Sequence, residues 1–146
     1  MKIEFITNSE EETFELGLSL GKKLHSGSII ALYGDLAAGK TTFVKGVASG
    51  VGGINSSEIN SPTFNFLNIY EGLNSFYHFD LYRLKNQDEF LQMGFDEYLE
   101  AGGICCIEWA ERMHMLLPEK RLDVSINHHN GSRKITIESD HEEINF

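Results

Sequence analysis

Gly34-Asp35-Leu36-Ala37-Ala38-Gly39-Lys40-Thr41 is the stretch of this chain from which its fold can be read. It matches the pattern Gly-x4-Gly-Lys-Ser/Thr of a loop that wraps phosphate groups. The apolar run 29–33 precedes it, and the stretch 42–51, whose composition suits a helix, follows it. The sequence therefore predicts a buried strand, a phosphate-binding loop and a helix in direct succession.

The residue types of this loop suit phosphate chemistry. Glycines keep side chains away from the ligand and allow positive φ, so that backbone N–H groups can turn inward. The helix then begins at the phosphates and directs its free N–H groups and positive dipole end at them. We expect Lys40 to place its charge at the β- and γ-phosphates and the Thr41 hydroxyl to bind Mg²⁺. The alternative is a Gly-rich strand-to-helix turn that binds nothing.

Ala37 occupies a position where such loops often need positive φ. A left-handed conformation costs a non-glycine residue roughly 1–2 kcal/mol. We predict a left-handed Ala37, held by the surrounding backbone hydrogen bonds and by bound phosphate.

Composition indicates one soluble domain. The length of 146 residues suits a single α/β domain spanning 1–146, and we expect the acidic tail 139–146 to be frayed. Twelve basic against twenty-two acidic residues give a formal charge of −10, which disfavours direct binding of nucleic acid. Neither a membrane span nor a signal peptide is expected. Cys105 and Cys106 are adjacent in an apolar run, which is typical of reduced core residues in a cytoplasmic protein.

Alternation and turn residues predict the remaining elements. Ser9 and Glu12 form a capping-box pattern that opens a helix reaching about His25. The other expected strands are 2–7, 64–70, 76–80, 104–107, 122–127 and 133–138, with hairpins at 72–74 and 130–131. Further helices are expected over 86–93, with a short continuation at 98–99, and up to Leu117 before Pro118.

Two carboxylates compete for the role of the acidic partner that a phosphate loop needs. Asp80 ends the strand 76–80 and Glu108 ends the more apolar strand 104–107. Burial slightly favours Glu108 as the Mg²⁺ ligand, which leaves Asp80 to orient the attacking water or to bind the outer shell of the metal. Either residue could instead be an ordinary carboxylate that caps the next helix.

Other residues near these motifs have two interpretations. Ser61-Pro62-Thr63 could be a switch segment whose Thr63 contacts the γ-phosphate, or simply a turn that starts a strand. Arg83 could stabilise the transferred charge or lie on the surface. His78 and Trp109 are interpreted as core or surface residues rather than as chemical groups.

The motifs taken together resemble one family. They occur in order along the chain: the phosphate loop 34–42, Ser61-Pro62-Thr63-Phe64, His78-Phe79-Asp80-Leu81-Tyr82-Arg83-Leu84, Gly94-Phe95-Asp96-Glu97-Tyr98 and Ile107-Glu108-Trp109-Ala110-Glu111. This string, which covers residues 1 to about 138, resembles the TsaE (YjeE) family of bacterial ATPases of tRNA threonylcarbamoyladenosine biosynthesis. That family usually has Gly-Ala-Gly in place of Ala37-Ala38-Gly39, and Pro is common in place of Ala110.

The resemblance implies a P-loop NTPase-like three-layer sandwich, a mixed β-sheet flanked by helices. It implies a Mg²⁺-dependent ATPase that acts with TsaD and TsaB, contacts tRNA only through that complex, and is slow alone and stimulated by its partners. Thr41 and Glu108 would bind Mg²⁺, Asp80 would serve hydrolysis with Lys40 and Thr63, and Ser61 would belong to the switch. The nucleotide would contact Glu10, near the adenine, Trp109 at the edge of the site, and the loop residues Gly34, Asp35, Leu36, Ala37, Ala38, Gly39, Lys40, Thr41 and Thr42.

Three other functions fit the loop less well. A GTP switch normally carries Asn-Lys-x-Asp, and the nearest string here, Lys85-Asn86-Gln87-Asp88, has the wrong order. A small-metabolite kinase needs a basic lid, whereas residues 84–102 contain one Lys, no Arg and five acidic residues. The third is a structural module that merely retains the loop.

Overall fold

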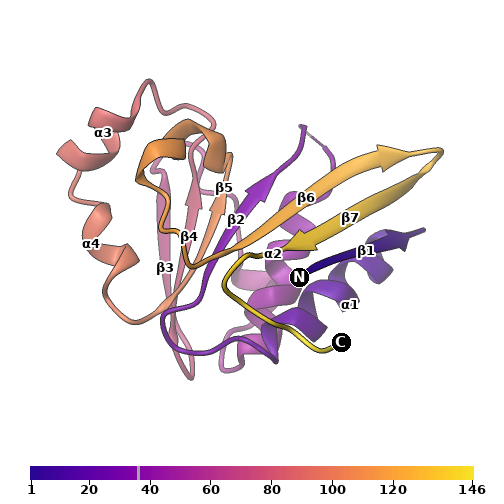
Figure 1. The fold of residues 1–146 in the computed structure, drawn as a ribbon. Helices are drawn as coiled ribbons and strands as arrows, with labels where there is room; N and C mark the ends of the chain where they lie inside the picture. Colours follow the sequence, from indigo (N-terminus) through magenta and orange to yellow (C-terminus); the bar gives the residue numbers. More distant parts are fainter. Residues whose placement is uncertain (36) are drawn as a thin grey trace.

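Within residues 1–35 and 37–146, which the computed structural model describes, seven strands form one mixed β-sheet. Their order across the sheet is β1-β7-β6-β2-β5-β4-β3 (Figure 1). The strands are β1 (Lys2–Thr7), β2 (Ile29–Tyr33), β3 (Leu67–Glu71), β4 (Ser75–Asp80), β5 (Ile104–Glu108), β6 (Leu122–His129) and β7 (Ser132–Glu138).

Four central strands run parallel, and antiparallel strands complete both edges. β2 pairs in parallel with β5 and β6, and β4 pairs in parallel with β5. β3 is antiparallel to β4, β7 to β6, and β1 to β7. Both expected hairpins are confirmed. The second turns at Asn130 and Gly131, whose φ values of 49° and 83° suit a tight hairpin turn.

Helices cover both faces of the sheet, as Figure 1 shows for the α1–α2 pair and the α3–α4 pair. The α-helices are α1 (Glu10–Gly21), α2 (Lys40–Val51), α3 (Gln87–Gln92) and α4 (Asp96–Leu99), and the 3₁₀ helices are Ser56–Glu58 and Ala110–Leu116. Alternate residues of β2 enter two apolar clusters, Ile30 and Leu32 on the α2 face, Ile29 and Ala31 on the other. The expected three-layer α/β sandwich is thereby confirmed. No helix of the described residues is long and apolar enough to cross a membrane.

Two element boundaries differ from the sequence-based expectation. α1 is capped by Ser9, whose side chain accepts from the Glu12 N–H as predicted, but it ends at Gly21 rather than near His25. β3 begins at Leu67 rather than Phe64, because Phe66 has a φ of 69° and its N–H donates to the Pro62 carbonyl at 2.7 Å. That turn keeps the preceding residues out of the sheet.

The C-terminal segment 139–146 has no helix or strand, but the expectation that it is frayed does not describe it. The Ser139 hydroxyl donates to the Arg121 carbonyl at 2.6 Å, and Ile144 is buried. The Phe146 ring packs edge-on against Phe5 of β1 with 5.1 Å between centroids. Apolar side chains within the acidic tail therefore hold it against β1.

Glycines allow α1 and α2 to pack with their backbones in direct contact. A Cβ on Gly46 of α2 would lie 2.1 Å from the Phe14 carbonyl oxygen, and one on Gly17 of α1 would lie 2.4 Å from that of Phe43. This close contact fixes the N-terminus of α1 beside the N-terminus of α2, where the phosphate loop ends.

We predict that Gly46→Ala lowers the free energy of unfolding by about 2 kcal/mol or more, because the added methyl group meets backbone that cannot move without separating the helices. Urea unfolding followed by circular dichroism measures the change. Ser49→Ala on the same helix is the matched control, and we expect it to be close to neutral. Equal stability of the Gly46 variant and the wild-type protein would contradict the tight packing of the two helices.

Candidate functional site

Three parallel strands bring the predicted site residues to the end of the sheet where these strands have their carboxyl termini. In the register of the sheet, Leu32 of β2 lies opposite Glu108 of β5, and Glu108 lies opposite Asp80 of β4. The carboxyl ends of all three strands therefore meet where the phosphate loop leaves β2. Ligands of open α/β sheets bind at such an edge.

The phosphate loop ends at the first turn of α2. Gly39, the N-cap of α2, has a φ of 104°, which glycine adopts without strain. Ala37 has a φ of 62°, so the predicted left-handed conformation is confirmed. The Ala38 N–H donates to the Asp35 carbonyl at 3.2 Å, which helps to hold the loop in this shape. Leu36, which we also predicted to line the site, lies outside the described residues.

Lys40 is a buried cation held between loop carbonyls and an aromatic ring. Its Nζ donates to the Gly34 carbonyl and, at 2.8 Å, to the Asp35 carbonyl. It also lies 4.3 Å from the centroid of the Trp109 ring. Burial lowers the pKa of Lys40, and the carboxylates around it, with that of Glu108 acting most strongly, oppose this shift.

Trp109 reaches Lys40 because the chain turns sharply after β5. Trp109 itself has a left-handed backbone, with φ 58° and ψ 43°. Its ring also packs against Tyr82, with 4.9 Å between centroids. The cation–π contact places Trp109 beside Lys40, whereas the residue type alone had suggested a core or surface residue.

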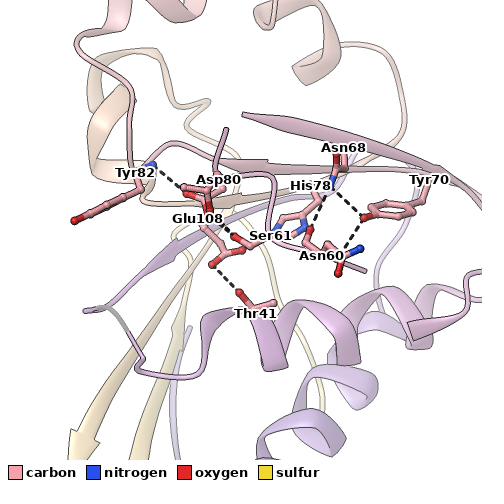
Figure 2. Close-up of polar contacts among 10 residues, drawn as sticks. Thr41, Asn60, Ser61, Asn68, Tyr70, His78, Asp80, Tyr82 and Glu108 are labelled. Carbon is pink, nitrogen blue, oxygen red and sulfur yellow. Dashed lines mark hydrogen bonds and ion pairs between the residues drawn. The ribbon is translucent and has the colours of Figure 1, made fainter. Parts of the chain in front are cut away.

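Thr41 and Glu108 present oxygen atoms to each other across the site (Figure 2). The Thr41 hydroxyl lies 3.5 Å from Glu108 Oε1, and the Glu108 side chain is only 3 % exposed. The described residues hold no cluster of three or more metal-ligating side chains. A hydroxyl and a carboxylate fit Mg²⁺, which takes one or two protein ligands and completes its octahedron with water and phosphate oxygens.

Asp80 is tied to the segment that we interpreted as a switch. The Ser61 hydroxyl donates to Asp80 Oδ2 at 2.5 Å, and the Thr63 hydroxyl donates to the same oxygen at 3.1 Å. The Tyr82 N–H donates to Asp80 Oδ1 at 3.0 Å (Figure 2). Ser61 and Thr63 thus contact the proposed hydrolytic carboxylate, an arrangement that the linear motifs did not reveal.

A cleft of about 430 Å³ joins most of these groups. Its walls include these predicted residues: Glu10, residues 37–42, Ser61, Thr63, Asp80, Glu108 and Trp109. A second hollow of about 250 Å³ shares Glu10, Ala37, Gly39 and Thr42 with it and extends between the start of α1 and the β6–β7 hairpin. Gly34 and Asp35 take part through their carbonyls, which accept hydrogen bonds from Lys40.

Sequence reasoning left out two residues of the site. His78 is fully buried and lies 2.5 Å from Glu108, and Arg133 of β7 donates to the Ala38 carbonyl at 3.1 Å. His78 had one signal, since it alternates with Asp80 on β4 and so shares its face. Arg133 had none, being 95 residues from its partner. Arg83 stays outside the site, exposed and 4.3 Å from the Phe64 ring.

These features define a class of protein. A phosphate loop between a central parallel strand and a helix, with an acidic residue at the end of the adjacent strand, is the arrangement of a P-loop NTPase-like fold. A model of the family described as "Threonylcarbamoyl adenosine biosynthesis protein TsaE" matches residues 7–135. The chain therefore belongs to the TsaE family.

Individual relatives agree with this assignment. A protein of Treponema pallidum is 41% identical over 133 residues, which cover 90% of this chain and 97% of the relative. A protein of Bacillus subtilis is 37% identical over 126 residues, which cover 86% of this chain and 77% of the relative. Both are named "tRNA threonylcarbamoyladenosine biosynthesis protein TsaE". The crystal structure of YdiB from Bacillus subtilis matches with a TM-score of 0.76 at 32% identity, covering 94% of this chain and 84% of that one.

We predict that Ala37→Gly raises the free energy of unfolding by about 1 kcal/mol, because glycine removes the left-handed penalty. Ala38→Gly is the matched control. Ala38 is buried and has no positive φ, so its variant should lose stability through backbone entropy and lost packing. Thermal and urea unfolding of both variants without nucleotide measure the two changes. Destabilisation of both variants to the same extent would contradict strain at Ala37.

Proposed function

We propose that this protein is the Mg²⁺-dependent ATP-binding and hydrolysing subunit of a complex that makes threonylcarbamoyladenosine in tRNA, acting with TsaD and TsaB. The observation that carries the proposal is the meeting of Lys40, Thr41, Glu108 and Asp80 at one end of parallel strands, within one cleft. The names of the family and of its relatives supply the pathway. Because all strands of the described residues join one sheet, we treat residues 1–146 as a single ATPase domain.

In this proposal the residues of the chain position the phosphates of ATP and neutralise their charge. Lys40 exchanges its loop carbonyls for the β- and γ-phosphates of ATP, and the N–H groups at the start of α2 contact the same oxygens. Thr41 and Glu108 would hold Mg²⁺, which would supply positive charge against the phosphates. The second hollow, beside Glu10 and the β6–β7 hairpin, takes the nucleoside.

Asp80 serves the hydrolytic step. Its carboxylate orients a water molecule and accepts a proton as the water oxygen bonds to the γ-phosphorus and the bond to the β-phosphate oxygen breaks. Ser61 and Thr63 occupy one oxygen of this carboxylate. A γ-phosphate that draws the Thr63 hydroxyl to itself would release Asp80 for the water, so the switch segment would couple nucleotide state to hydrolysis.

The proposal includes slow hydrolysis by the isolated protein and stimulation by partners. Arg83 stacks on Phe64 and Arg133 donates to the Ala38 carbonyl, and neither lines the cleft that holds the phosphate-binding residues. A group supplied in trans raises turnover by about 10³–10⁵-fold in related P-loop systems. Phe64, 76 % exposed, adjoins the switch segment and gives the partner an apolar contact close to the γ-phosphate.

Titration of the TsaD–TsaB pair into the protein, with phosphate release measured, tests this function. We expect ATP turnover to rise and saturate with the pair, GTP to be a poor substrate, and tRNA alone to have no effect because the protein carries a formal charge of −10. The proposal places the protein in the cytoplasm, where it meets tRNA only through the complex. Full stimulation by tRNA alone, or neither binding nor stimulation by the pair, would contradict it.

We predict opposite kinetic signatures for the two carboxylates. Glu108→Ala should weaken nucleotide binding in Mg²⁺ by about tenfold or more while leaving binding in chelator nearly unchanged, since Glu108 acts on the nucleotide mainly through the metal. Asp80→Ala should retain affinity and lose hydrolysis by about 10²-fold or more. Equilibrium binding and single-turnover hydrolysis separate these effects. The reverse pattern would show that the roles of the two carboxylates are exchanged.

A further inference from the structure

His78 is a fully buried polar residue in the middle of β4, surrounded in sequence by aromatic residues. Its Nε2 lies 2.5 Å from Glu108 Oε2, and both side chains are almost completely removed from solvent. Its other ring nitrogen, Nδ1, has no hydrogen-bond partner among residues 1–35 and 37–146. A buried ring nitrogen without a hydrogen bond costs free energy, and an apolar residue would fill the same space without that cost. A histidine at this position therefore indicates a role for the nitrogen that is bonded.

The register of the sheet explains how His78 reaches Glu108. His78 lies opposite Cys106 of β5, and Asp80 lies opposite Glu108. Residues two apart on a strand share a face, so His78 and Glu108 are diagonal neighbours on the face that packs against α2. Figure 2 shows Glu108 between β4 and the first turn of α2, where Thr41 lies.

The two oxygens of Glu108 consequently have different partners. Oε2 meets His78, and Oε1 faces the Thr41 hydroxyl at 3.5 Å. The unbonded Nδ1 indicates which ring nitrogen carries the proton. A proton on Nδ1 would be a buried donor with no acceptor, whereas a proton on Nε2 is donated directly to the carboxylate.

We propose that His78 is a positioning residue that donates its Nε2–H to Glu108 Oε2 and so keeps Oε1 directed at Thr41 and the Mg²⁺ position. This inference rests on the proposed function, since it needs Glu108 to be a metal ligand. Partners of this kind fix the orientation of a ligating side chain, and their loss lowers metal affinity by about 10–100-fold. His78 touches neither nucleotide nor metal, so nucleotide binding without metal should not depend on it.

Three variants separate the hydrogen bond from packing. His78→Leu fills the space and removes the donor. His78→Gln carries an amide nitrogen at a reach comparable to that of Nε2, whereas His78→Asn has its amide one bond closer to the backbone and too short for Glu108. Trp109 is the only tryptophan of the chain and lies over Lys40, so its fluorescence reports ADP binding without a label.

ADP affinity is measured in Mg²⁺ and in chelator for the wild-type protein and for each variant. We expect Mg²⁺ to enhance ADP affinity in the wild-type protein and in His78→Gln. In His78→Leu and His78→Asn this enhancement should fall by about 10–100-fold, with affinity in chelator unchanged within about twofold. An undiminished enhancement in His78→Leu, or a loss in Gln as large as in Asn, would overturn the proposal. An equal loss in Mg²⁺ and in chelator would show a structural role instead.

The wild-type protein provides an independent test if a variant does not fold. Long-range ¹H–¹⁵N correlation spectra of the imidazole ring show which nitrogen carries the proton. A protonated Nε2 with a bare Nδ1 is expected, and a bare Nε2 would overturn the proposal. The same measurements test the proposed function and the role of His78 separately. If Mg²⁺ does not enhance ADP affinity in the wild-type protein, the proposed function fails, whereas unaltered enhancement in folded His78→Leu refutes only the role of His78.

Discussion

The register of three parallel strands is the constraint on which the site depends. Leu32, Glu108 and Asp80 lie side by side on β2, β5 and β4. A slip of one residue in either pairing would turn the carboxylates to the opposite face, away from α2. Because these strands are buried on both faces by two separate apolar clusters, such a slip would also place each cluster on the wrong side. The hydrophobic pattern that stabilises the fold therefore also aligns the chemical groups.

The same arrangement explains how buried charge is tolerated at this edge of the sheet. Lys40, Asp80 and Glu108 are each no more than 5 % exposed, a composition that would be costly without partners. Lys40 donates to two loop carbonyls and lies over the Trp109 ring. Asp80 accepts hydrogen bonds from two hydroxyls and a backbone N–H. Glu108 contacts His78 and Thr41. Each group is thus held in one orientation before any nucleotide arrives. Side chains preorganised in this way suit the binding of phosphates and a metal ion.

Local signals in the sequence predicted much of the fold. The loop pattern, the Ser9 cap, the alternating strands and the Asn-Gly turn each depend on residues close together in the chain, and each corresponds to an element of the structure. The left-handed Ala37 followed from the same kind of argument. The late start of β3 did not, because the turn from Pro62 ends at Phe66 with a φ of 69°, a conformation that an aromatic residue in an alternating run does not predict.

Contacts between distant elements could not be derived in this way. The hydrogen bonds from Ser61 and Thr63 to Asp80 span more than fifteen residues, and the pairing of His78 with Glu108 spans thirty. Their existence depends on which strands become neighbours, which the pattern of a single strand does not state. The apolar residues within the acidic tail likewise acquire a partner only when β1 lies at the sheet edge beside them. The sequence therefore identified candidate groups, whereas the structure shows which of them act on one another.

Equilibrium binding of ATP in Mg²⁺, followed by the fluorescence of Trp109, tests the central claim most directly. The claim is that Lys40, held beneath Trp109, is the phosphate-binding cation of the site. The account predicts a saturable fluorescence change in the wild-type protein and at least a tenfold weaker affinity in Lys40→Ala, with GTP binding more weakly than ATP. Lys40→Arg keeps the charge but not the compact shape, and should recover only part of the affinity. Wild-type affinity in a folded Lys40→Ala protein, or no saturable binding in the wild-type protein, would contradict the account.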